Sequence, residues 1–315
     1  MFCLNPARRS ATVAAGVLLV CLTGRADAHD LASARKLLMS GKYAEALEAY
    51  TGLSKDRPLE SVLGAARCRR AVGELDAAKS GLREALKAIS DRAQAARLHG
   101  ELADLALEQG DLAQADEHSR AAIAGQDDEL AGRWVQAELH RLKGQLEEAN
   151  EAYRWFVTYY NDRDTSDAEA LRWIGLAAAQ YARWNRLTDQ FHFLVNELYV
   201  DALRLEPDFW PAHHETGRLF LEKYNEADAV KALKAALALN PQSATTYVAL
   251  AELAIQNFEL GEAKKSLDQA LAINPNLLEA HLVQADVHFC NLDALQASEV
   301  LRVALPLKPN AEEVL

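Results

Sequence analysis

Four histidines form two groups that, by residue type alone, could contribute to a metal site: adjacent His213 and His214, and His281 and His288 on one expected helix. A zinc site needs three or four ligands in tetrahedral arrangement. No carboxylate stands at a spacing that completes such a set, and residues 213–217 do not form the His-Glu-x-x-His motif. The sequence also contains no glycine-rich phosphate loop, nucleophile elbow or Ser-His-Asp arrangement. We therefore predict no metal site, no cofactor and no catalytic residues.

The first 28 residues have the pattern of a secretory signal peptide, with Arg8 and Arg9 before a short apolar run over 11–24 and small residues up to Ala28. That run is too short to span a bilayer comfortably, and we expect cleavage after Ala28. An uncleaved anchor is the alternative. Lipoprotein and twin-arginine signals fit less well, because Val20 precedes Cys21 and apolar residues do not follow the arginine pair. We expect a secreted or periplasmic protein, with no stable membrane span after signal cleavage.

Charge and cysteine usage exclude further classes of protein. Without the three arginines and one aspartate of the leader, the formal net charge falls from −12 to −14. An acidic chain repels nucleic-acid backbones, so we expect no nucleic acid as partner. Cys68 and Cys290 stand too far apart for a disulfide framework, and we expect both to be buried thiols.

A 34-residue period organises the second half of the chain. Pro207, Pro241, Pro275 and Pro309 mark it, and small or apolar residues recur between them. We count the places of each repeat from residues 210, 244 and 278. The eighth place then holds Gly217, Ala251 and Ala285, and the twentieth place holds Ala229, Ala263 and Ala297. The twenty-fourth place holds Leu233, Leu267 and Leu301, and the twenty-seventh holds Ala236, Ala270 and Ala304. The first half keeps a looser period, with glycines at expected turns: Gly41, Gly73, Gly110 and Gly144.

This pattern resembles the tetratricopeptide repeat, a 34-residue helix–turn–helix unit. The resemblance implies an all-α fold, a right-handed α-solenoid of about eight repeats. Small residues at three places let helices pack closely, and the proline ends the second helix. We expect repeats 1–4 over 29–160, an irregular fifth repeat with an extended join over 161–207, and repeats 6–8 plus the start of a further helix over 208–315.

In this family ligands lie on the concave face, at places 2, 5, 9, 12 and 13 of each repeat. Here the expected ligand-facing residues are Arg35, Arg67, Arg70, Asp104, Trp134, Glu138, Arg172, Arg218, Glu222, Glu252, Gln256 and Asp286. They predict a groove that is basic at its N-terminal end and more acidic towards the C-terminal end. The fifth places do not match the lysine of the family's carboxylate clamp, so recognition of a chaperone's acidic tail is not indicated.

Aromatic residues concentrate in the centre of the chain: 13 of 22 lie between Tyr153 and Trp210. They form either an aromatic-lined groove or a core that joins the irregular repeat to its neighbours, and the core interpretation is favoured. Trp184, Phe191 and Phe193 are the ones we expect to be exposed. At the other end, Val300, Leu301 and Val303 predict an exposed apolar face that a partner covers, that self-associates, or that a longer chain continues.

Together these features predict a non-catalytic, extracytoplasmic scaffold or adaptor that binds a protein or peptide in its groove. Two alternatives remain open. One is an N-terminal binding module of a secreted peptidase system, since some secreted bacterial proteins that resemble this one carry a metallopeptidase domain after their repeats. The other is an adaptor in envelope assembly or secretion.

Overall fold

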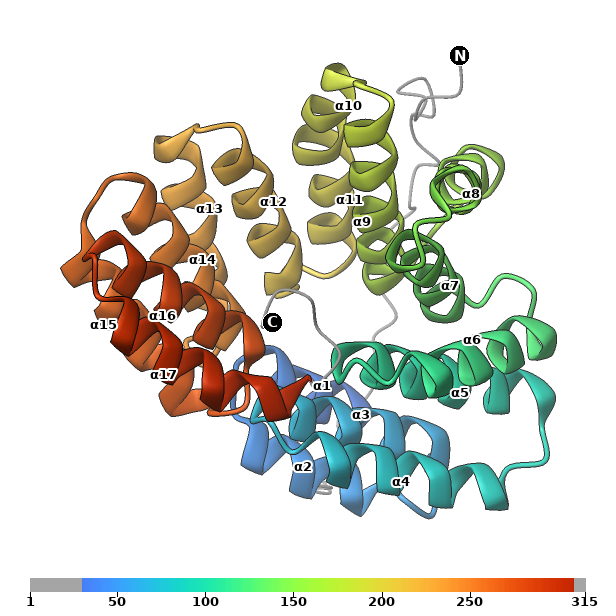
Figure 1. Ribbon diagram of the computed structural model, residues 1–315. Coiled ribbons are helices and arrows are strands. Elements are labelled where there is room, and N and C mark those ends of the chain that lie inside the picture. The colour runs from blue at the N-terminus through green and yellow to red at the C-terminus, as the bar shows by residue number, and fades with distance from the viewer. Residues whose placement is uncertain (1–29, 309–315) are drawn as a thin grey trace, which may run out of the picture.

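The computed structural model describes residues 30–308, which fold into helices stacked in pairs (Figure 1). The leader, its expected cleavage site and the helix expected to start after Pro309 lie outside the described residues. No helix in the described range is long and apolar enough to cross a membrane. The helices are α1 (Leu31–Met39), α2 (Tyr43–Gly52), α3 (Pro58–Ala71), α4 (Leu75–Ala88), α5 (Arg92–Glu108), α6 (Leu112–Gly125), α7 (Leu130–Leu142), α8 (Leu146–Asp162), α9 (Ala168–Trp184), α10 (Thr188–Phe193), η1 (Leu194–Leu198), α11 (Tyr199–Leu205), α12 (Trp210–Glu222), α13 (Glu226–Leu239), α14 (Ala244–Gln256), α15 (Leu260–Ile273), α16 (Leu278–Cys290), α17 (Ala294–Ala304) and η2 (Leu305–Leu307).

The prolines of the 34-residue period lie in the loops between helix pairs. Each second helix ends just before the proline, and the residue that precedes it is extended: φ is −138° at Glu206, −127° at Asn240 and −132° at Asn274. A proline disfavours the helical conformation in the residue before it. The period therefore places the ends of α11, α13 and α15 as predicted.

The small residues of the period lie where helices approach most closely. The repeated alanines at the twentieth and twenty-seventh places are fully buried. A Cβ on Gly217 would lie 2.6 Å from the side chain of Leu233, so the large residue at place 24 fills the space that the glycine leaves. The all-α fold and the packing role of these places are confirmed.

Each helix pair turns through one residue with positive φ. In the first four pairs this residue is the glycine expected at the turn, with φ between 69° and 84°. In the last four pairs it is a larger residue, with φ between 54° and 59°: Arg186, Tyr224, Phe258 and Leu292. The sequence pattern did not reveal these last four turns, because their residues give no glycine signal.

The irregular fifth repeat absorbs its extra residues in its second helix. The join continues through α10 into a π-helical segment, η1, and then α11. This longer helix turns Phe191 and Phe193 inwards, where they are only 7% and 8% exposed, so the expectation that they are exposed is wrong. Phe193 packs edge-on against Tyr160, with ring centroids 6.0 Å apart. Trp184 is 37% exposed and packs on Tyr153.

The solenoid completes a turn, so that its first repeats lie beside its last ones (Figure 1). Hydrogen bonds join residues 171 to 203 positions apart in the sequence. We call this set of contacts the seam. It joins Arg35, Gly41, Tyr43, Gly73 and Gly110 to Glu206, Asn240, Gln242, Asn274, Asn276 and Lys308.

The two cysteines of the described chain differ in their surroundings. Cys68 is buried, and burial raises the pKa of its thiol to about 12. Cys290, at the end of α16, is exposed. The expectation that both are buried is therefore wrong for Cys290, which lies beside the exposed side chains of Phe289 and Leu292.

Candidate binding channel

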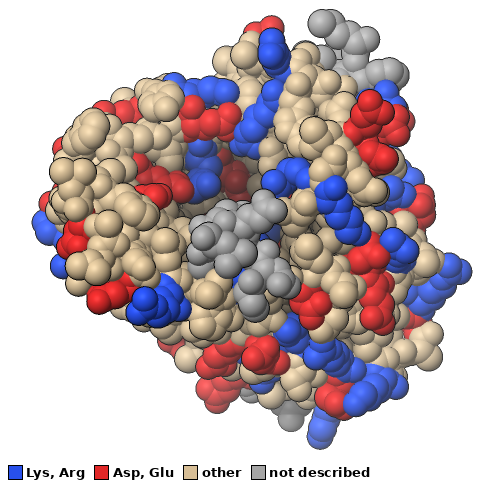
Figure 2. All heavy atoms as spheres, viewed as in Figure 1, with Lys and Arg blue, Asp and Glu red and all other residues tan. Residues whose placement is uncertain are grey.

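The closed turn of the solenoid surrounds a cavity of about 590 Å³, which we call the channel. Its wall is built mainly from first helices of the pairs, α1, α3, α5, α9, α12, α14 and α16. Figure 2 shows the molecule hollowed at this place, with basic and acidic side chains on the wall. The first helices thus line the inner surface, as the resemblance implied.

Four arginines project into the channel, and each has a carboxylate partner. Arg70 Nη1 lies 2.5 Å from Asp104 Oδ2, and Arg218 Nη1 lies 2.6 Å from Glu252 Oε2. In both pairs the partner stands 34 residues further along the chain, in the same place of the next repeat. Arg67 pairs with Glu101 at 3.5 Å, and Arg172 with Glu169 at 3.3 Å. Arg67, Arg70 and Arg218 therefore tie neighbouring first helices together, whereas Arg172 pairs within α9.

This pairing alters the expected charge of the channel. Burial opposes ionisation of Glu169, yet Arg172, Arg67 and Arg35 outweigh it and lower its pKa. Burial raises the pKa of Glu215, which Arg172 and Arg218 only partly oppose. Within residues 30–308, Glu215 and Glu279 form no ion pair within 4.0 Å. The basic N-terminal end expected from the sequence is thus neutralised internally.

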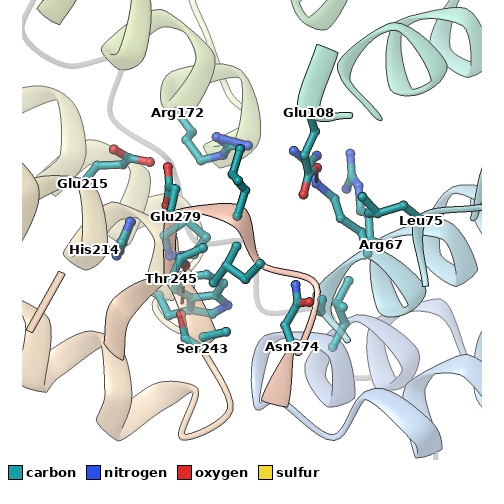
Figure 3. Close-up of a pocket in the computed structure, with 18 of the residues that line it drawn as sticks. Arg67, Leu75, Glu108, Arg172, His214, Glu215, Ser243, Thr245, Asn274 and Glu279 are labelled. Atoms are coloured by element: carbon teal, nitrogen blue, oxygen red, sulfur yellow. Dashed lines mark hydrogen bonds and ion pairs between the residues drawn. The ribbon is translucent and has the colours of Figure 1, made fainter. Parts of the chain in front are cut away.

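The side chains of the channel fall on two sides (Figure 3). Glu215 and Glu279 lie with Arg172 and His214 on one side, and Arg67 and Glu108 lie across from them. Burial raises the pKa of Glu108, although Arg70 Nε lies 2.7 Å from its carboxylate. The wall also includes the aromatic rings of Trp173 and Trp210. A segment in the channel would therefore meet both charged and apolar groups.

The histidines that opened the question of a metal site have other partners. His214 Nδ1 lies 3.1 Å from Thr246 Oγ1, and burial, with Arg218 and Arg172, lowers the pKa of His214 to about 3. Its imidazole is therefore neutral at physiological pH. His281 is buried, with Nε2 2.9 Å from the carbonyl oxygen of Pro275. In the described part of the chain, no group of three or more His, Cys, Asp or Glu residues is arranged to hold a metal ion.

Of the twelve residues expected to face a ligand, the channel brings together four: Arg67, Arg70, Arg172 and Arg218. Asp104 and Glu252 are their partners. The other six are not among the residues that line the channel: Arg35, Trp134, Glu138, Glu222, Gln256 and Asp286.

The surroundings of these six residues vary. Arg35 binds Glu206 through two hydrogen bonds of 2.6 Å at the seam. Trp134 packs into the core beside Trp173, and Glu138 is buried and accepts hydrogen bonds from Arg141 and Tyr153. Glu222 pairs with Arg183, the Gln256 amide donates a long 3.5 Å bond to the Leu221 carbonyl, and Asp286 is exposed. The closed turn thus accounts for the position of Arg35, and the central aromatic group for that of Trp134.

Several channel residues were missed from the sequence. Trp173 and Trp210 belong to the central aromatic group, most of which forms a core as favoured. Ser243, Thr245, Asn274 and Asn276 come from loops and first turns after the second helices. Their position beside the repeated prolines was a signal that could have found them.

The apolar C-terminal end is only partly as expected. Val303 is 60% exposed, whereas Val300 and Leu301 are half-buried. Larger exposed side chains lie nearby on α16 and α17 and the turn between them: Phe289, Leu292 and Leu295. The exposed apolar surface thus centres on the turn rather than on the last helix.

Comparison with known proteins agrees with this architecture. The sequence model of the tetratricopeptide repeat matches residues 244–277, which include α14 and α15. No curated protein matches the chain.

Two solved structures have a similar fold. One is a chain of the APC/C hetero-tetramer Cut9–Hcn1, with a TM-score of 0.53 and 17% identity over 88% of this chain and 52% of that chain. This chain therefore spans about half the length of that one. The other is a tetratricopeptide repeat protein from Parabacteroides merdae, with a TM-score of 0.51 and 15% identity over 81% of this chain and 95% of that chain. The chain is thus an all-α solenoid of helix pairs, in which residues 244–277 match the tetratricopeptide repeat and the whole arrangement is similar to that of a tetratricopeptide repeat protein.

Proposed function

We propose that this protein is a non-catalytic, extracytoplasmic scaffold that holds an extended segment of a partner protein in its channel. The observation that carries the proposal is the channel itself, whose wall comes from repeats at both ends of the chain. Its volume of about 590 Å³ falls in the range of roughly 300–1,000 Å³ that suits a drug-sized ligand. A space of that size suits a short extended segment and excludes a folded domain.

The charges of the wall favour a neutral or basic segment over an acidic one. The four arginines that could attract an acidic segment already have carboxylate partners. A ligand that took one arginine would leave a carboxylate without its partner, which costs free energy. Glu215 and Glu279 have no such partner in the described chain, and a lysine or arginine side chain would provide one. The ion pairs also hold the wall in place before binding, so little ordering is needed.

Location outside the cytoplasm rests on the leader pattern of residues 1–28. A fractionation of the native host that sequences the N-terminus of the periplasmic or secreted protein tests it. A new N-terminus at His29 is expected. An intact leader on a cytoplasmic protein would contradict this part of the proposal and leave the channel untouched.

Binding in the channel can be tested by site-specific photocrosslinking. A photoreactive amino acid replaces Thr245, which lines the channel, or Lys265, whose side chain is 73% exposed on α15. We expect one partner to be crosslinked from position 245 and not from position 265, with the crosslinked peptide lying in an extended segment. Crosslinks from position 265 alone would place the partner on the outer surface and overturn the proposal.

A further inference from the structure

The seam repeats one contact three times in register. The turn glycines of the first three repeats lie under the loops that follow the second helices of the sixth, seventh and eighth. A Cβ on Gly41 would lie 2.3 Å from Asn240 Oδ1, one on Gly73 2.3 Å from Asn274 Oδ1, and one on Gly110 2.6 Å from Lys308 Cγ. Real Cβ atoms do not approach other atoms this closely, so a larger residue at any of these three positions would have to displace the side chain that lies against it.

The residues on the other side of the seam share one place in the sequence pattern. Glu206, Asn240, Asn274 and Lys308 each precede a proline of the 34-residue period. Glu206 accepts both hydrogen bonds from Arg35, and the next three lie against the glycine turns. The residue before each of these prolines, at the end of a second helix, therefore faces the opposite side of the ring.

Polar hydrogen bonds join the two sides of the seam. Asn240 Nδ2 donates to the hydroxyl oxygen of Tyr43 at 3.0 Å, and that hydroxyl donates to the carbonyl oxygen of Gln242 at 3.0 Å. Burial raises the pKa of Tyr43 to about 12, so the hydroxyl keeps the proton it donates. Asn276 Nδ2 donates to the carbonyl oxygen of Gly73 at 3.1 Å.

The hydrogen-bonded contacts of the seam differ in kind from those within the repeats. Successive helices pack through buried alanine, leucine and aromatic side chains, whose exposure to water is unfavourable. One of these core clusters also crosses the ring, because it joins Leu38 and Met39 of the first repeat to side chains of α9–α12. Water can replace each hydrogen bond of the seam when the two sides separate. In a solenoid, moreover, each repeat is stabilised by its neighbours in sequence, and separation of the seam breaks none of these contacts between successive repeats.

We propose that the seam is the gate of the channel: it separates while the repeats stay folded, and so opens the channel along one side. Opening would admit an internal stretch of a partner chain, which has no free end to thread. This inference depends only on the seam geometry and stands apart from the identity of any ligand.

A reversible cross-link tests the gate in the absence of ligand. With Gly73→Cys and Asn276→Cys, the two Cβ positions lie about 3.2 Å apart, close to the roughly 3.5–4.5 Å of a disulfide. Asn274→Ala in the same protein removes the amide that a Cβ at position 73 would meet. Cys290→Ser removes the exposed native thiol. Hydrogen exchange is then compared between the oxidised and reduced forms of the same protein. The segment 207–213 reports on the channel, because Trp210 and Pro211 line it away from the cross-link. Helix α6 is the internal control.

We expect exchange in 207–213 to be at least tenfold slower in the oxidised form and unchanged in α6. Equal rates in the two forms would overturn the gate. A second experiment uses variants that introduce no new strain. Tyr43→Phe combined with Asn240→Ala removes hydrogen bonds of the seam. Asn257→Ala, at an exposed turn outside the seam, is the matched control. The double variant should speed exchange in 207–213 about tenfold. Equal exchange in the double variant and the Asn257 control would also contradict the proposal.

Discussion

The turns of the first three repeats and those of the last four adopt the same backbone conformation with opposite kinds of residue. Gly41, Gly73 and Gly110 lie beneath loops from the far end of the chain. Tyr224, Phe258 and Leu292 are 81%, 83% and 93% exposed. A left-handed residue at the turn is therefore a requirement of every repeat, whereas glycine is a requirement of the seam.

The fourth repeat separates these two effects within the same chain. Gly144 has φ of 69°, as the other turn glycines do, yet no atom lies within 4 Å of where its Cβ would be. It has the conformation of a seam glycine and the open surroundings of the later turns. Gly144 is consequently the natural control for any change at Gly41 or Gly73.

The largest expected effect comes from placing the same large residue at both kinds of turn. Gly41→Phe adds the cost of a left-handed non-glycine residue, about 1 kcal/mol, and a steric conflict with Asn240 and Gln242 worth about 2 kcal/mol. Gly144→Phe adds only the cost of the left-handed conformation, because Phe258 shows that such a turn accommodates a phenylalanine. Urea unfolding followed by circular dichroism should therefore show a loss of about 3 kcal/mol against about 1 kcal/mol.

Equal losses for the two variants would mean that the seam is open in solution. If Gly41→Phe unfolds the protein altogether, Gly41→Ala and Gly144→Ala give the same comparison with a smaller conflict. A larger loss of stability at Gly41 than at Gly144 would show that the seam is closed in solution, whatever the size of the two losses.

A smaller effect is expected from the ion pair at the seam. Arg35 and Glu206 have side chains 29% and 20% exposed, and two hydrogen bonds join them. The pair of Arg204 and Asp201 has the same charges but is 69% and 41% exposed. A bidentate, partly buried pair should have a coupling energy of about 1 kcal/mol, and an exposed one about 0.3 kcal/mol.

Double-mutant cycles with alanine at both positions of each pair measure these coupling energies. Raising the salt concentration should reduce both, and the exposed pair first. A coupling energy at Arg35 no larger than that at Arg204 would show that closure gains nothing from this contact.

Contacts between residues that are close in the sequence could be predicted, and contacts between distant residues could not. The places of Gly217, Leu233 and the buried alanines could be predicted, because they depend on helices next to each other in the chain. The pairs Arg70–Asp104 and Arg218–Glu252 could also have been found from the sequence, since the two residues of each pair stand one period apart.

Ring closure was not accessible in this way. It depends on small rotations between neighbouring repeats, which accumulate over five of them and leave no local pattern. Glu206, Asn240 and Asn274 accordingly gave only the signal of a helix end, and Arg35 was taken for a ligand contact. Phe191 and Phe193 were expected to be exposed because they lie on the extended join, whereas the join is itself helical and continues through α10 and the π-helical segment into α11.

The smallest effect concerns the later turns, where the comparison predicts a gain. Phe258 keeps φ at 59° with an exposed side chain, so glycine there would relieve about 1 kcal/mol of strain and lose part of it to the greater freedom of the unfolded chain. Phe258→Gly should stabilise the protein by about 0.5 kcal/mol. Phe258→Ala is the matched variant, because it removes the ring and keeps the strain, and its urea midpoint should not change. If both variants destabilise equally, the ring itself contributes to stability, and the later turns are not free of packing as their exposure indicates.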